Sequence, residues 1–249
     1  MKLRLDKLLV DRGLAVSRER AQSLILAGKV LVNNQKLDKA GAQVGADAVV
    51  RLLGEDLTYV SRGGLKLARA LEHWQIDVEG KLCLDVGAST GGFTDCLLQH
   101  GAVRVIAIDT GYGQMDFKLR QDPRVHLLEK SNARYLTDEI IGEKVDLIVI
   151  DVAFISATLV LPPVVNAAFP HSLDERRGRQ IIVLVKPQFE AGREFVGKGG
   201  IVRNEAAQLA AVQKIKGSLL ALGCARMDVI DSPILGAEGN REFLLLGVF

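Results

Sequence analysis

Cysteines are scarce in this 249-residue sequence, and that scarcity excludes some classes of protein. The three that occur, Cys83, Cys96 and Cys224, are an odd number and form no Cys-x-x-Cys pair. This argues against a disulfide framework and against a zinc site, so we expect reduced, mostly buried thiols and no metal. Aromatic residues are also few, at 5%, but 48% hydrophobic and 25% charged residues are typical of a protein with a real core.

Long apolar runs are missing as well, although the mean hydropathy is +0.18. A membrane-spanning helix needs about 20 consecutive apolar residues. The best candidate, residues 145–165, contains Asp146 and Asp151 and ends at Pro162 and Pro163, which favours a buried strand followed by a loop. Residues 1–10 alternate charged residues with leucines, unlike a secretory signal. We therefore expect a cytoplasmic protein that does not interact with a membrane.

Positive charge is concentrated at the N-terminus. The whole chain has a formal net charge of +2, but residues 1–40 contain nine lysines and arginines against four acidic residues, a net +5. A basic segment on a slightly acidic body indicates a contact with nucleic acid, although a solvated helix face is the alternative.

The pattern of the same segment predicts a small domain over residues 1–55. Leucines at helical spacing indicate a first helix that ends at Gly13, Ser17 is positioned to cap a second helix, and Gly28 closes it before the strand-like run 29–32. The stretches 4–9, 18–21 and 28–33 resemble the RNA-binding module named after the fourth protein of the small ribosomal subunit. The resemblance implies RNA binding through basic side chains of this segment, namely Arg4, Lys7, Arg18, Arg20 and Lys29.

A different rhythm follows a predicted linker at residues 56–62. Apolar runs at 82–86, 103–108, 125–128, 145–150, 181–185, 227–230 and 242–248 are separated by segments of helical length. Alternating strands and helices predict an α/β domain over residues 63–249, with a seven-stranded, mostly parallel, Rossmann-like sheet.

A glycine-rich turn follows the first of these strands and is predicted to bind a cofactor. It comprises Asp85, Gly87, Ala88, Ser89, Thr90, Gly91, Gly92 and Phe93. Ser89 stands where a dinucleotide-binding turn has its second glycine, which disfavours a dehydrogenase. Asp109, at the end of the second strand, is placed to accept hydrogen bonds from the ribose hydroxyls of an adenosine cofactor. The combination fits S-adenosylmethionine, with Asn132 and Ala133 either in an adenine pocket or in an ordinary loop.

Three charged residues fall at strand ends that are predicted to meet at one edge of the sheet. Asp151 ends the fourth strand, Lys186 ends the fifth, and Glu242 opens the last strand. In such sheets ligands bind outside the carboxyl ends of the strands, and Glu242 lies at that edge if the last strand is antiparallel. We therefore expect these groups to converge beside the cofactor, with Asp151 also next to the methyl donor.

Together with Lys66, which follows Gly63-Gly64-Leu65, these residues resemble the Lys-Asp-Lys-Glu tetrad of ribose 2′-O-methyltransferases of the FtsJ type. The flanking segments 61–66, 186–190 and 239–242 resemble the haemolysin A (TlyA) family of ribosomal RNA methyltransferases, and the resemblance covers essentially the whole chain. It implies methylation of a cytidine 2′-hydroxyl in ribosomal RNA. The chain looks like the family's shorter form, which favours the large-subunit RNA, with the small-subunit RNA as an additional target left open.

The chemistry of a tetrad can be stated from its residues. A ribose hydroxyl must lose its proton as it attacks, and a lysine serves as the base only in its neutral form. We assign that role to Lys186, with Lys66 as a cationic neighbour and with Asp151 and Glu242 holding the two ammonium groups. Lys198 and Arg203, in a glycine-containing segment, are predicted either to contact RNA near the site or to be an ordinary exposed loop.

Two other functions stay open at this point. One is a pore-forming haemolysin, and the other is an RNA-binding ribosome assembly factor that has lost activity. Neither the exact nucleotide nor the oligomeric state follows from the sequence.

Overall fold

The computed structural model describes residues 2–15, 17–53 and 58–249. The chain divides into two compact units, Met1–Leu57 and Thr58–Phe249. The first two residues of the predicted linker, 56 and 57, lie outside the described residues. Each unit has its own hydrophobic core.

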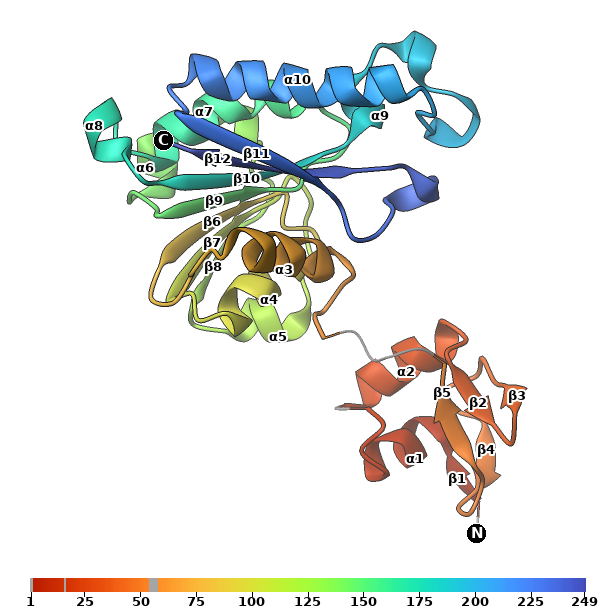
Figure 1. Ribbon diagram of the computed structural model, residues 1–249. Coiled ribbons are helices and arrows are strands. Elements are labelled where there is room, and N and C mark those ends of the chain that lie inside the picture. Colours follow the sequence, from red (N-terminus) through yellow and green to blue (C-terminus); the bar gives the residue numbers. More distant parts are fainter. Residues whose placement is uncertain (1, 16, 54–57) are drawn as a thin grey trace. The chain divides into compact units, whose positions relative to one another are not determined.

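The N-terminal unit combines two short helices with short strands (Figure 1). β1 (Lys2–Arg4) pairs antiparallel with β4 (Gln43–Gly45), and β2 (Val30–Val32) pairs with β3 (Gln35–Lys36) and β5 (Val50–Leu52). The helices are α1 (Leu5–Asp11) and α2 (Arg18–Leu26). Leu5, Leu9 and Ile25 are fully buried between them and the strands.

Local sequence explains where these elements begin and end. The Ser17 hydroxyl accepts a hydrogen bond from the Arg20 backbone N–H at 3.2 Å and so caps α2, as predicted. Asn33 and Asn34 both adopt positive φ, 51° and 65°, which gives the tight turn between β2 and β3.

The second unit is a three-layer α/β domain built on a seven-stranded sheet, in the order β11-β12-β10-β9-β6-β7-β8. The strands are β6 (Leu82–Val86), β7 (Arg104–Ile108), β8 (Val125–Leu128), β9 (Leu147–Ile150), β10 (Gln180–Val185), β11 (Arg226–Asp231) and β12 (Phe243–Val248). The five strands β6 to β10 are parallel, whereas β12 is antiparallel to both of its neighbours. The predicted fold class is confirmed, and the antiparallel β12 brings its first residue to the carboxyl edge of the parallel strands.

Helices cover both faces of this sheet (Figure 1). One face carries α3 (Gly63–Trp74), α4 (Gly92–Gln99) and α5 (Phe117–Gln121), and the other carries α6 (Asp138–Ile141), α7 (Leu161–Ala168) and α10 (Glu205–Ala221). The short helices α8 (Leu173–Arg176) and α9 (Pro187–Glu190) flank β10. The 3₁₀ turns are η1 (Ala133–Tyr135), η2 (Ala157–Leu159), η3 (Arg193–Phe195), η4 (Lys198–Gly200) and η5 (Ala237–Gly239).

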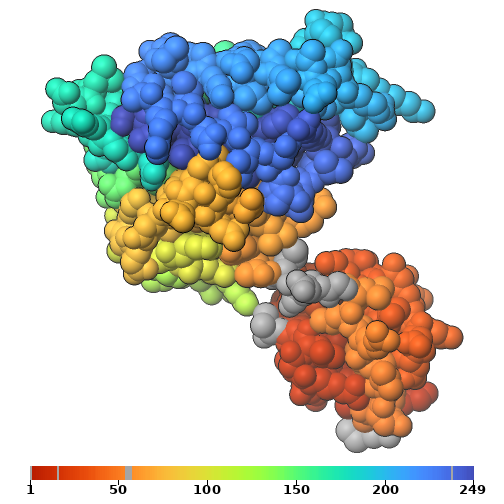
Figure 2. Space-filling view, viewed as in Figure 1, coloured from red at the N-terminus to blue at the C-terminus, as the bar shows by residue number. Residues whose placement is uncertain are grey.

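The central strands β9 and β10 are almost entirely apolar because both faces of the sheet are covered there. Residues 147–150 and 181–185 are buried at every position. The three cysteines are buried and free, as predicted. Figure 2 shows the segment between α9 and α10 projecting from the surface of this unit.

Candidate active site

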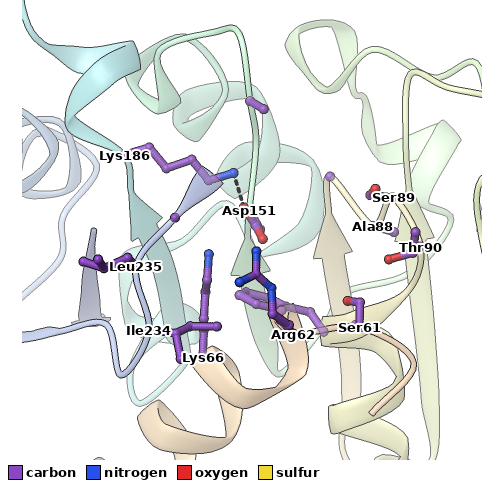
Figure 3. Close-up of a pocket in the computed structure, with 16 residues that line it drawn as sticks. Ser61, Arg62, Lys66, Ala88, Ser89, Thr90, Asp151, Lys186, Ile234 and Leu235 are labelled. Carbon is purple, nitrogen blue, oxygen red and sulfur yellow. Dashed lines mark ion pairs between the residues drawn. The ribbon is translucent and has the colours of Figure 1, made fainter. Parts of the chain in front are cut away.

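The carboxyl edge of the parallel strands contains two cavities of about 330 and 350 Å³. Both are lined by Gly87, Ser89, Asp151 and Ala153, so they form one cleft. The first cavity is also lined by Ser61–Gly63, Lys66, Ala88, Thr90, Gly92, Phe93, Lys186 and residues 234–236 (Figure 3). The second extends between Ile108–Thr110, Ser131–Ala133 and the loop 152–155. Volumes of this size are usual for small-molecule sites.

The glycine-rich turn allows the backbone to approach closely at the base of this cleft. Gly87 has a φ of +87°, and a β-carbon there would collide with the backbone of Asp151. Ser89 adopts a φ of +48°, an uncommon conformation for a residue with a side chain. The Asp109 carboxylate supports that conformation by accepting hydrogen bonds from the backbone N–H groups of Ser89 at 2.8 Å and Gly111 at 2.6 Å. Asp109 therefore shapes the turn and also lines the second cavity.

Not every residue of the predicted cofactor site lines the cleft. Asp85 is fully buried beneath the turn, where one carboxylate oxygen accepts a 2.6 Å hydrogen bond from Thr94 and the other has no partner. Burial raises the pKa of Asp85 to about 7. Gly91, with a φ of +93°, lies at the start of α4 and also lines neither cavity. Both residues support the turn from below, whereas the remaining predicted cofactor residues line the cleft.

The four residues of the predicted tetrad form two ion pairs. Lys186 Nζ lies 2.5 Å from Asp151 Oδ1, and Lys66 Nζ lies 2.5 Å from Glu242 Oε2. In Figure 3, Lys66 and Lys186 approach Asp151 from different elements. We predicted that carboxylates hold both ammonium groups, and in the structure each lysine has its own carboxylate partner.

The two pairs differ in their exposure. The side chains of Lys186 and Asp151 are 14% and 21% exposed and line the first cavity, whereas Glu242 is only 2% exposed and lies behind Lys66. Gly236 packs directly against the Glu242 carboxylate, where any side chain would collide with it. Lys186 and Asp151 are therefore the pair available to a substrate, and Glu242 supports Lys66 from behind.

Sequence reasoning missed several residues of the cleft. Ser61 and Arg62, assigned to a linker, line the first cavity at the start of α3, and Arg62 points toward Asp151 in Figure 3. Phe154, in the loop after Asp151, is 92% exposed with a φ of +64° and packs against Phe189 at 5.4 Å between ring centroids. Its position three residues after a strand-end carboxylate was the signal that could have identified it.

In the N-terminal unit, a buried carboxylate organises two of the predicted RNA-binding arginines. Asp6 is fully buried and accepts hydrogen bonds from Arg4 at 2.8 and 3.0 Å, Arg18 at 3.2 Å and Gln22 at 3.1 Å. The bonds from Arg4 hold the pKa of Asp6 well below its ordinary value. The guanidinium of Arg18 is therefore directed to Asp6, although its side chain is still 54% exposed. Lys7 is exposed, and Arg20 and Lys29 are partly buried.

The segment with Lys198 and Arg203 is anchored to the wall of the site. Asn240, which is 2% exposed, accepts a hydrogen bond from the Val202 N–H at 3.0 Å and donates one to the Gly200 carbonyl at 2.9 Å. Lys198 and Arg203 are exposed on this segment. Asn240 thus connects it to the turn that precedes Glu242.

Among residues 2–15, 17–53 and 58–249, no helix is both long and apolar enough to span a bilayer. In the same part of the chain, no cluster of three or more histidine, cysteine, aspartate or glutamate side chains is arranged for a metal ion.

Comparisons with known proteins agree with this architecture. Residues 59–249 match the FtsJ-like methyltransferase family, and residues 3–50 match the S4 domain. A Mycobacterium tuberculosis protein named 16S/23S rRNA (cytidine-2′-O)-methyltransferase TlyA is 45% identical over 243 residues, covering 97% of this chain and 88% of the relative. Hemolysin A of Brachyspira hyodysenteriae is 39% identical, covering 97% of this chain and 98% of the relative.

A solved hemolysin structure from Streptococcus thermophilus has 40% identity and a TM-score of 0.74, covering 99% of this chain and 88% of that one. The predicted family, enzyme class and methyl donor, S-adenosylmethionine, are thereby confirmed. The chain belongs to the FtsJ-like methyltransferase family and carries an S4 domain at its N-terminus.

Proposed function

We propose that this protein transfers a methyl group from S-adenosylmethionine to the 2′-oxygen of a cytidine ribose in ribosomal RNA, with the large-subunit RNA as its target. In this proposal residues 1–55 are the RNA-binding domain and residues 63–249 the catalytic domain. The observation that carries the proposal is the Lys186–Asp151 pair, which lines the cleft directly beside the glycine-rich turn. Two relatives, 45% and 32% identical to this chain, are named as ribosomal RNA cytidine-2′-O-methyltransferases.

The residues of the cleft fit an adenosine-containing cofactor. The second cavity presents the Asp109 carboxylate for two ribose hydroxyls and the segment at Asn132 and Ala133 for the adenine ring. Gly87 leaves room for a close approach of the cofactor to the backbone. The bound cofactor supplies a methyl group on a positively charged sulfur, which we place where the two cavities meet at Asp151.

The remaining chemistry is performed by this chain's own residues. Lys186 is an ammonium paired with Asp151 in the cofactor-free protein and releases its proton to solvent when the cofactor and RNA are bound. Its Nζ then positions the ribose 2′-hydroxyl and accepts the hydroxyl proton while the new oxygen–carbon bond forms. Asp151 orients Nζ and stabilises the ammonium that results. The Lys66–Glu242 pair holds Lys66 in place at the wall of the same cavity.

A substitution of Lys186 tests this assignment. Lys186→Ala should retain its fold and bind S-adenosylmethionine and RNA nearly as the parent does, but lose about 10²- to 10⁴-fold in methyl transfer. Lys186→Arg should not restore transfer, because a guanidinium does not release its proton near neutral pH. The matched control is Lys216→Ala on α10, which removes the same charge from a helix that does not line the cleft.

The assay is single-turnover transfer of labelled methyl groups at saturating cofactor and ribosomal RNA, followed by mapping of the 2′-O-methyl position. Transfer at the parental rate by Lys186→Arg would eliminate proton removal by this residue. A methyl group found on a base or a protein would overturn the proposed reaction itself.

The N-terminal unit supports the proposal through its charge. Arg4 and Arg18 are held by one buried aspartate and keep their side chains about half exposed, and Lys7, next to that aspartate in the sequence, is exposed as well. Cationic side chains of this kind bind RNA phosphates without selecting a sequence. We therefore assign affinity for ribosomal RNA to this unit.

A further inference from the structure

Glu190 is a buried carboxylate that lies outside the cleft and has no part in the mechanism above. It ends α9, four residues after Lys186, and its side chain is only 3% exposed. A buried carboxylate is costly unless its oxygens are hydrogen-bonded, so its partners indicate what it stabilises.

The partners of Glu190 come from the loop that follows Asp151. One oxygen accepts a 2.6 Å hydrogen bond from the backbone N–H of Ala157, and the other accepts a 2.5 Å bond from the Ser156 hydroxyl. Ser156 caps the start of η2, five residues after Asp151. Lys214 on α10 adds a third contact at 3.2 Å and balances the charge.

This arrangement links the two strands that carry the reactive ion pair. β9 and β10 are neighbouring parallel strands; the chain leaves β9 through Asp151 and leaves β10 through Lys186. Glu190 joins these two segments a few residues further on. The contact between Phe154 and Phe189 lies between the same two segments.

We propose that Glu190 is a positioning residue for methyl transfer, which fixes the separation of Lys186 and Asp151 by joining the segments that carry them. This inference rests on the proposed function of that pair. A lysine side chain has four rotatable bonds, so its ammonium group is easily displaced. A misplacement of about 1 Å at a reacting group can cost about 10²-fold in rate. Loss of the link should therefore reduce the chemical step while leaving both ligand-binding surfaces in place.

The test uses the full chain and the nearly isosteric variant Glu190→Gln. A glutamine keeps one acceptor oxygen for the Ala157 N–H, but its amide nitrogen must donate to the Ser156 hydroxyl. That hydroxyl oxygen already accepts from the Thr158 N–H at 3.3 Å and from Lys214 at 3.2 Å, so the bond to Ser156 is lost. Ser156→Ala removes one of the two bonds from the other side and should give a smaller loss. Glu205→Gln is the matched control, because Glu205 is a 75% exposed carboxylate at the start of α10.

Single-turnover transfer should fall about 10- to 100-fold in Glu190→Gln, with the cofactor dissociation constant and the RNA concentration for half-maximal rate within about threefold of the parent. Glu205→Gln should match the parent in all three quantities. A parental rate for Glu190→Gln would overturn the inference, and so would a loss of cofactor affinity as large as the loss of rate, since the role would then be general support of the fold.

A second measurement decides the inference without methyl transfer. The ammonium protons of a lysine held in an ion pair exchange slowly with water, so the Lys186 ammonium should give a nitrogen NMR signal in cofactor-free parent protein, assigned by its absence in Lys186→Arg. That signal should disappear in Glu190→Gln and persist in Glu205→Gln. If the parent transfers no methyl group to ribosomal RNA, the proposed function fails, and persistence of the signal in Glu190→Gln is then what refutes the role of Glu190.

Discussion

The buried pair formed by Lys66 and Glu242 permits a quantitative prediction about stability. Glu242→Ala removes the carboxylate and leaves the Lys66 ammonium, only 11% exposed, without the group that lies 2.5 Å from it. Breaking a buried ion pair by removing one partner typically costs about 3–5 kcal/mol, because an uncompensated charge is left behind. For a unit of about 190 residues, each kcal/mol lowers the melting temperature by roughly 2–4 °C. The expected decrease is therefore about 6–20 °C.

The single tryptophan makes this measurement specific to the second unit. Trp74 ends α3, the helix that carries Lys66, and its indole N–H donates a 2.9 Å hydrogen bond to Asp228. Urea and thermal unfolding followed by tryptophan fluorescence thus reports that unit without interference from the N-terminal one. Glu205→Ala is the control, because the exposed pair that it breaks with Arg241 should contribute at most about 1 kcal/mol. Equal midpoints for the Glu242→Ala and Glu205→Ala variants would show that the buried pair adds nothing to stability.

Three further predictions concern the cofactor, the RNA and pH. Asp109→Ala should weaken binding of S-adenosylmethionine in calorimetry by more than the lost ribose contacts alone, because the same carboxylate supports the backbone of Ser89; unchanged affinity would contradict the assignment. Arg18→Ala combined with Arg20→Ala should weaken RNA binding and reduce the slope of the log binding constant against log salt concentration by about 1. The change is smaller than the loss of two full charges would give, because Asp6 already offsets part of the Arg18 charge. A parental slope would refute phosphate contacts at these arginines. Burial raises the pKa of Asp85 to about 7, above its value of 3.8 when unfolded, so the folded state binds the extra proton. The contribution of Asp85 to the free energy of unfolding should therefore be largest below pH 4 and fall by up to about 4 kcal/mol as the pH rises to 7. Asp85→Asn should remove that dependence in tryptophan-monitored unfolding, and an equally steep dependence in the variant would assign it to other groups.

The parallel strands were the easiest part of the fold to predict. Because residues 147–150 and 181–185 are buried on both faces of the sheet, each appears in the sequence as an uninterrupted apolar run, and the predicted limits differ from the observed ones by at most two residues. The three-residue strand β1 was not predicted, since a segment with alternating leucines and charges leaves no signal that separates it from the helix that follows. Its partner β4 lies about 40 residues further along the chain, and such a pairing is not encoded in local periodicity.

The residues of the candidate site were partly predictable for the same reason. Strand ends are visible in the sequence, so Asp151, Lys186 and Glu242 could be placed at one edge. Asp6 could not be identified, because its role depends on burial against arginines that come from two different elements. Glu190 was likewise hidden, since nothing in the sequence indicates that the loop after Asp151 returns to α9.

The pairing within the tetrad depends on strand order, which explains why the sequence left it open. β10 lies between β9 and β12, so the end of β10 at Lys186 has a carboxylate on each side, Asp151 after β9 and Glu242 before β12. α3 packs against one face of the sheet, where it contacts β12, and it carries Lys66 to Glu242. Asp151 is then left as the partner of Lys186. Had β12 been parallel, Glu242 would lie at the opposite edge, and Lys66 would have to compete with Lys186 for Asp151. The antiparallel last strand therefore supplies each lysine with its own carboxylate, and this arrangement leaves both lysines at the wall of the first cavity, with Glu242 buried.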